Sequence, residues 1–199
     1  MRYLLLSTAI GDISGKPYES WRTRIKDYDS VERVSAAGFL AKSKDECIRL
    51  ATETAMPTHN HPEGIKGAVA TALAIHYCMN GHDKSYIKEK VLDEYYPDWS
   101  GKSYSEIKPG YYFDSSCQGS VPAALLSFLE SKDFVDCLKL AISLGGDSDT
   151  LAAISAPIAY AYYRVIPEAL LDNARKKLPK WMLELSESFD DFIVTLHRN

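Results

Sequence analysis

Residues 145–153 read GGDSDTLAA, and this short stretch says most about how the chain folds. Gly145 and Gly146 permit a sharp backbone turn, because glycine adopts conformations that other residues avoid. The Leu-Ala-Ala run that follows opens a helix with small side chains, which let a neighbouring helix approach closely. The stretch therefore predicts two helices joined by a tight turn, with polar groups at the start of the second.

The chain on both sides of this turn is also helical in its pattern. Ser43 and Glu46 fit the capping box of a helix that runs to about Ala55. Pro62 suits the first turn of another helix, which should stop at Gly81. Further helices are expected over residues 85–95, 120–131, 133–144, 147–163, 167–178 and 179–196, with a turn-rich connection over 97–110. Alternating β-branched runs of strand length are missing, so the sequence predicts an all-α fold.

The composition is that of one globular domain. The chain has 199 residues, of which 46% are hydrophobic and 25% are charged, and this balance excludes a disordered chain or a disulfide-rich miniprotein. We therefore expect a compact, single-domain helical bundle over residues 1–199. A formal net charge of −4 argues against a nucleic-acid partner, since such binding needs clustered Lys and Arg.

The sequence also predicts a cytoplasmic protein without a membrane partner. No apolar stretch approaches the ~20 residues that span a bilayer. Gly11 and Asp12 interrupt the N-terminal apolar run where a signal peptide needs a small-residue cleavage site. The four cysteines form no CxxC pair, so a zinc site is unsupported and a reducing compartment fits. The oligomeric state is left open.

The turn at residues 145–150 is also the first candidate for chemistry. Asp147 falls near a helix N-cap, and Asp149 and Thr150 fall in the first turn. Two carboxylates and a hydroxyl at one helix start are the hard oxygen ligands that Mg²⁺ or Mn²⁺ prefers. Plain helix punctuation, a C-cap glycine followed by an N-cap aspartate, is the alternative that these residues leave open.

A histidine-rich loop is the second candidate, since residues 58–64 read THNHPEG. His59 and His61 are possible metal ligands if carboxylates elsewhere support the imidazoles. Alternatively, the loop and the helix start offer backbone N–H groups and side chains to an anionic or polar ligand. An N-cap formed by Asn60, with two structural histidines, is the third possibility.

Two further segments carry weaker signals. Residues 11–19 read GDISGKPYE, in which Glu19 is a candidate cleft carboxylate or, alternatively, an exposed residue after a helix that ends at Gly15. The aromatic run at 111–113 precedes CQGSVP at 117–122, and its rings are suited to stack on a base or a ribose or to pack in the core.

Together these four segments resemble the ADP-ribosylglycohydrolase family, of the dinitrogen-reductase-activating glycohydrolase type. The resemblance rests on residues 11–19, 58–64, 117–122 and 145–150. It implies an all-α fold around a binuclear Mg²⁺ or Mn²⁺ centre that binds ADP-ribose. It also implies hydrolysis of the N- or O-glycosidic bond between ADP-ribose and a protein side chain or a small molecule.

The resemblance also assigns roles to residues of this sequence. It implies that Asp147, Asp149 and Thr150 are metal ligands and that Glu19 and Asp147 are catalytic carboxylates. The substrate-binding residues that it implies are His59, Asn60, His61, Gly145, Gly146 and Ser148.

One family motif has no counterpart in this chain. The family's Thr-Asp-Asp-Thr motif supplies the other half of the metal ligands, but the acids that follow Glu19 stand in no such motif. The sequence reads as though an internal block between about Trp21 and Asp29 were deleted. Two carboxylates in place of roughly four offset an ion's dehydration poorly, so one weak site is expected rather than two. The sequence thus predicts either a hydrolase of impaired activity or a non-catalytic, ADP-ribose-binding or regulatory descendant.

Overall fold

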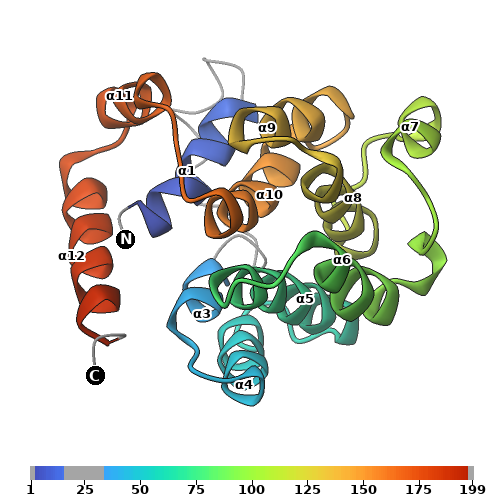
Figure 1. The fold of residues 1–199 in the computed structure, drawn as a ribbon, viewed down its shortest axis with the longest axis horizontal. Helices are drawn as coiled ribbons and strands as arrows, with labels where there is room; N and C mark the ends of the chain where they lie inside the picture. Colours follow the sequence, from blue (N-terminus) through green and yellow to red (C-terminus); the bar gives the residue numbers. More distant parts are fainter. Residues whose placement is uncertain (1–2, 16–33, 197–199) are drawn as a thin grey trace.

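Two helices that are far apart in the sequence form the centre of the fold. The computed structural model describes residues 3–15 and 34–196, and in it α1 (Leu4–Gly15) lies along α10 (Ser148–Tyr163) (Figure 1). Gly11 makes this contact possible, because a Cβ at that position would overlap the carbonyl oxygen of Ala152 and lie 2.9 Å from the Cα of Ala153. Helix α1 therefore packs closely against the small residues that follow the Gly-Gly turn.

Three long helices surround α10 and complete the core. They are α5 (Pro62–Met79), α8 (Cys117–Glu130) and α9 (Phe134–Ser143). Helices α5 and α8 are buried along most of their length, whereas α9 buries one face. On the far side of α5 lie α3 (Ser35–Leu40) and α4 (Lys44–Ala55), in the lower part of Figure 1. Burial of this apolar surface, at roughly 25 cal/mol per Å², is the main contribution that favours the fold.

The segment between α5 and α8 consists of short helical pieces. Helix α6 (Lys84–Ile87) continues into a π-helical turn, η1 (Lys88–Asp93). The 3-10 turns η2 (Pro97–Trp99) and η3 (Lys108–Gly110) flank α7 (Tyr104–Ile107). The wider π turn leaves the apolar side chains of Ile87, Val91 and Leu92 all fully buried. The helix expected over residues 85–95 is therefore found, with a π-helical stretch in its middle, and the turn-rich connection is found as well.

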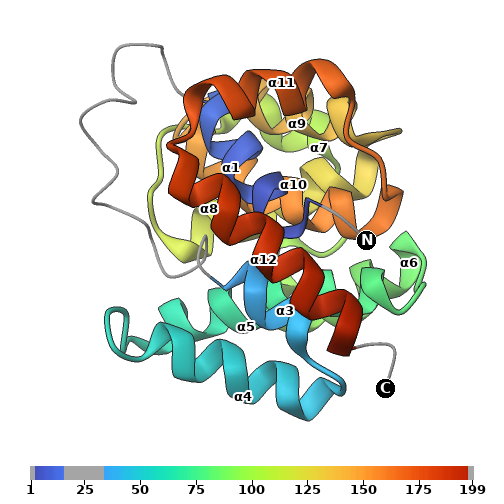
Figure 2. The same ribbon diagram turned by 90° about the vertical axis from the view of Figure 1, so that its left-hand side faces the viewer.

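The C-terminal helices pack on α1. Helix α11 (Glu168–Lys177) and helix α12 (Lys180–Leu196) lie at the edge of the molecule, and Figure 2 shows α12 crossing the side that holds α1. The buried carboxylate of Asp190 accepts the N–H of Tyr3 at 2.5 Å and the N–H of Leu4 at 2.9 Å. These N–H groups stand at the start of α1, where no turn of helix provides acceptors. Asp190 thus caps α1 from the other end of the chain.

The prediction of an all-α fold is confirmed, since the described ranges hold helices and no strand. The start expected at residue 120 is three residues late, because Ser116 caps α8. Ser43 accepts the N–H of Glu46 at 3.2 Å, but the Glu46 carboxylate accepts from Lys42 rather than Ser43, so the capping box is half formed. None of the helices in residues 3–15 and 34–196 combines the length and apolar content needed to cross a membrane.

Candidate functional site

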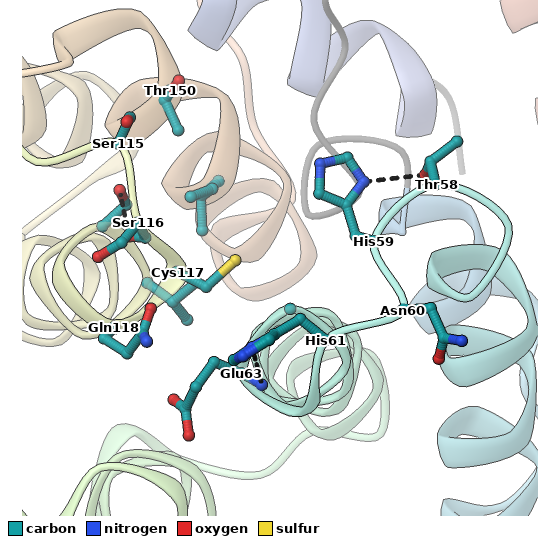
Figure 3. A pocket seen from close by; sticks show the side chains of 14 residues that line it. Thr58, His59, Asn60, His61, Glu63, Ser115, Ser116, Cys117, Gln118 and Thr150 are labelled. Carbon is teal, nitrogen blue, oxygen red and sulfur yellow. Dashed lines mark hydrogen bonds between the residues drawn. The ribbon is translucent and has the colours of Figure 1, made fainter.

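A cavity of about 500 Å³ lies where three helices begin. Figure 3 shows side chains from the loop before α5, the start of α8 and the first turns of α10 facing it. The described residues that line it are Thr58, His59, Asn60, His61, Glu63, Gly64, Ser115, Ser116, Cys117, Gln118, Ser120, Val121, Thr150 and Ile154. The cavity therefore brings together the histidine-rich loop, the CQGSVP segment and the first turns of α10 after the Gly-Gly-Asp turn, which are far apart in the sequence.

His61 starts α5 and is its N-cap. Pro62 follows it and has no N–H, so the first donor that needs a partner is the N–H of Glu63. The Nδ1 atom of His61 accepts that N–H at 3.3 Å. In the neutral imidazole the proton then resides on Nε2, which becomes a hydrogen-bond donor. The cap is His61 and not Asn60, because the proline fixes which residue precedes the first turn.

The rest of the histidine-rich loop folds back on this first turn. The N–H of His59 donates to the carbonyl oxygen of Ala55 at 2.8 Å, and Nδ1 of His59 lies 2.9 Å from the hydroxyl of Thr58. Gly64 lies directly beneath: a Cβ there would come within 3.1 Å of the carbonyl oxygen of His59. The backbone of the half-buried His59 is thus held by α4 and lies against a glycine of α5, while its ring contacts the Thr58 hydroxyl.

Serine and aspartate caps position the second wall of the cavity. Asp114 accepts the N–H of Ser116 at 2.8 Å, and the hydroxyl of Ser116 accepts the N–H of Gly119 at 3.3 Å. The hydroxyl of Ser120 donates to the carbonyl oxygens of Asp114 and Ser116, both at 2.9 Å. These bonds fix the turn that carries Cys117 into α8.

Several of these wall residues were not among the predicted site residues. Ser115, Ser116 and Gln118 face the cavity, as does Cys117, which belongs to the quoted CQGSVP segment. The sequence signal that could have indicated this capped helix start is an Asp-x-Ser stretch directly before an apolar helix. The cavity position itself comes from packing, since Cys117 meets α5 at Gly67, where a Cβ would lie 3.2 Å from its Sγ.

The third wall begins at the Gly-Gly turn. Gly145 and Gly146 both have positive φ, +89° and +68°, a region that favours glycine. A Cβ on Gly146 would lie 2.9 Å from the Tyr111 ring, so the aromatic loop packs against this turn. Burial, with the nearby charges of Asp114 and Asp147, raises the pKa of Tyr111 to about 12. Tyr111 therefore stays a neutral phenol beside the turn.

The structure brings together some of the predicted site residues and not others. Predicted residues that line the cavity are His59, Asn60, His61 and Thr150. Those that form the turn leading to Thr150, without being among the described lining residues, are Gly145, Gly146, Asp147, Ser148 and Asp149. Asp147 holds the N-cap position of α10 without a side-chain capping bond. Glu19 lies outside the described residues.

Metal-binding side chains are sparse in the described part of the chain. Among the side chains that the structure describes, in residues 3–11 and 34–196, no group of three or more His, Cys, Asp or Glu is placed to hold a metal ion. Two adjacent divalent cations repel each other and need bridging anions. The donors at the start of α10 are the carboxylates of Asp147 and Asp149 and the hydroxyl of Thr150, and they are hard oxygen ligands of the kind that Mg²⁺ or Mn²⁺ prefers.

The fold and the cavity define an all-α protein in which residues from the starts of three helices line one cavity. A family model described as ADP-ribosylglycohydrolase matches residues 20–197, and the chain belongs to this family. The resemblance noted in the sequence is therefore confirmed.

Curated relatives and a solved structure agree with this assignment. The chain is 29% identical over 117 residues to "ADP-ribosylarginine hydrolase Tri1" of Pseudomonas putida, covering 54% of this chain and 30% of that protein. It is 28% identical over 154 residues to the protein of the same name from Serratia proteamaculans, covering 72% and 41%. The chain thus spans less than half the length of these two relatives. A solved structure titled "ADP-ribosylglycohydrolase-related protein complex" has a TM-score of 0.63 at 22% identity, covering 85% of this chain and 59% of that one, and it supports the fold.

Proposed function

We propose that this chain binds an ADP-ribosyl group in the 500 Å³ cavity and hydrolyses the N- or O-glycosidic bond that joins it to a protein side chain or a small molecule. The observation that carries the proposal is the meeting of three family segments at one cavity. The cavity is also large enough for a ligand of this class, since pockets for small molecules range from about 300 to 1,000 Å³.

Helix direction supports an anionic ligand. Residues from the first turns of α5, α8 and α10 line the cavity, and each helix start carries the positive end of the helix dipole. A diphosphate is the part of ADP-ribose that such an environment stabilises. The Nε2–H of His61 and the amides of Asn60 and Gln118 add neutral donors for ribose or phosphate oxygens.

The carboxylates have a separate role in the proposal. Cleavage of a glycosidic bond builds positive, oxocarbenium-like charge on the ribose, which nearby carboxylates stabilise. We assign this role to Asp147, with Glu19 acting on water or ribose. A single Mg²⁺ or Mn²⁺ held by Asp147, Asp149 and Thr150 belongs to the proposal.

A second candidate function is that of a non-catalytic ADP-ribose-binding or regulatory protein. It is the alternative because the family's Thr-Asp-Asp-Thr motif has no counterpart in this chain. Both candidates share the cavity and the ligand, and they differ only in turnover.

A hydrolysis assay separates the two candidates. ADP-ribosylated arginine, the substrate class in the name of the Tri1 relatives, is incubated with the chain and Mn²⁺, alongside serine-linked and ester-linked ADP-ribose. Turnover that Asp149→Ala abolishes supports the hydrolase. The matched control is Asp45→Ala, which removes an exposed acid from the first turn of α4, away from the cavity. No turnover above Asp149→Ala, with ADP-ribose still bound, supports the non-catalytic candidate.

A cytoplasmic location is likewise a proposal. Cys47, Cys78, Cys117 and Cys137 are all free thiols, and three of them are buried. Buried free cysteines are ordinary core residues in a reducing compartment.

A further inference from the structure

A second cavity of about 610 Å³ shares a wall with the first. Asp114 and Gly119 line it, whereas residues 115–118 between them line the first cavity. The opposite wall comes from the segment between η2 and η3, far from the Gly-Gly-Asp turn in sequence. No motif of the family resemblance falls on that wall.

Three aromatic side chains line the second cavity. Trp99, Tyr111 and Tyr112 line it, and the Tyr112 side chain is 74% exposed. A tight turn follows Trp99, because the N–H of Lys102 donates to its carbonyl oxygen at 3.2 Å and Gly101 has a φ of +80°. This turn places the Lys102 ammonium 5.3 Å from the centroid of the Trp99 ring.

The charges around these rings leave a cation open to a ligand. Both carboxylates in the lining already cap helices: Glu106 accepts the N–H and the hydroxyl of Ser103, each at 2.7 Å, and Asp114 accepts the N–H of Ser116. The resulting bonds lower the pKa of Glu106, so it stays ionised and engaged. Lys102, in contrast, forms no ion pair with any carboxylate whose side chain the structure describes, and its ammonium stands over the Trp99 ring in the lining of the cavity.

We propose that this second cavity is a binding site for a planar ring system that carries a phosphate, such as a mononucleotide. The ring stacks on Trp99 and the tyrosines, and stacking of a base on an aromatic side chain contributes about 1–3 kcal/mol. The phosphate meets the Lys102 ammonium. This site is separate from the ADP-ribosyl cavity and goes beyond the proposed function.

Trp99 provides the signal that tests the proposal. Replacing Trp21 and Trp181 by Phe leaves Trp99 as the one tryptophan of the chain, which has three in all. Titration with AMP should quench its fluorescence in a saturable way. Adenosine or inorganic phosphate alone should bind at least about fivefold more weakly, because each lacks one of the two contacts.

Variants identify where the nucleotide binds. Lys102→Met should raise the Kd for AMP about fivefold to tenfold, since it removes the cation and keeps the length of the side chain. Lys108→Met is the matched control: its ammonium also stands over a ring, 5.5 Å from the centroid of Tyr104, but it does not line the cavity. This control should leave the Kd for AMP unchanged.

The same titration separates this site from the first cavity. Thr150→Val alters the ADP-ribosyl cavity and should leave the Trp99 signal intact. Loss of the signal in Thr150→Val, with Lys102→Met unaffected, would place the nucleotide in the first cavity and overturn the second site. Absence of saturable quenching would also overturn it. If the two phenylalanine replacements prevent folding, calorimetry with AMP on the natural-tryptophan chain, with and without Lys102→Met, decides the same question.

Discussion

His59, in the loop before α5, and Thr150, in the first turn of α10, line the same cavity (Figure 3). Neither residue alone indicates a binding site, because a loop histidine and a helix-start threonine are both common. Their meeting depends on α10, which packs on both α5 and α8 and so brings the starts of three helices together. The proposed ADP-ribosyl site depends on this proximity of the three helix starts.

The contact between α1 and α10 predicts a large loss of stability on substitution of Gly11. In Gly11→Ala the new Cβ would overlap the Ala152 carbonyl oxygen, a backbone atom that cannot move aside alone. We expect a loss of about 3 kcal/mol or more in the free energy of unfolding, measured by urea denaturation. Gly110→Ala is the control, because nothing lies within 4 Å of a Cβ there. Equal stability of the two variants would contradict the close packing of these helices.

The N-cap role of His61 predicts that stability and binding can be separated. His61→Ala removes the acceptor for the Glu63 N–H and should cost about 1 kcal/mol of stability. His61→Asn supplies a good N-cap and should restore most of that stability, but its side chain is too short to place a donor where Nε2–H stands. ADP-ribose binding, measured by calorimetry, should therefore weaken in both variants. Full binding by His61→Asn would show that the ring makes no contact with the ligand.

The donors on α10 predict one weak metal site. Calorimetric titration with Mn²⁺ should reveal a single ion with weak affinity, because two carboxylates and a hydroxyl offset little of its dehydration. Asp149→Ala should abolish this binding and Asp45→Ala should preserve it. Two ions bound cooperatively would contradict the interpretation and would require further ligands from residues outside the described ranges.

Burial of Cys47 predicts a loss of stability in alkali. Burial, with a smaller contribution from Glu46, raises the pKa of its thiol from 9.0 to about 12. Between these values the unfolded chain holds fewer protons than the folded one, so the free energy of unfolding falls as pH rises from about 9 to 12. In urea denaturation at pH 8 to 11, Cys47→Ala should show a shallower fall than the natural chain. Val165→Ala, at an exposed side chain that carries no ionisable group, should keep the original slope.

Local signals in the sequence predict most helices but only part of the site. Ser43 marks a helix start by capping, Pro62 marks another by its fixed φ, and the Gly145–Gly146 turn separates two helices by its positive φ. Each of these signals depends on a few neighbouring residues. The roles of Ser116 and Gln118 were missed, because their place at the cavity follows from the packing of α8 on α5 and α10. The spacing of residues along the sequence does not indicate which distant segments come into contact.

Calorimetric titration of the chain with ADP-ribose tests the central claim most directly. We predict saturable binding at one site, weakened about fivefold to twentyfold in Thr150→Val, which removes a buried hydroxyl from the cavity and preserves its shape. Thr54→Val, on α4 and outside the cavity, should bind as the natural chain does. Absence of binding by the natural chain, or identical affinity in Thr150→Val, would contradict the assignment of this cavity to the ADP-ribosyl group.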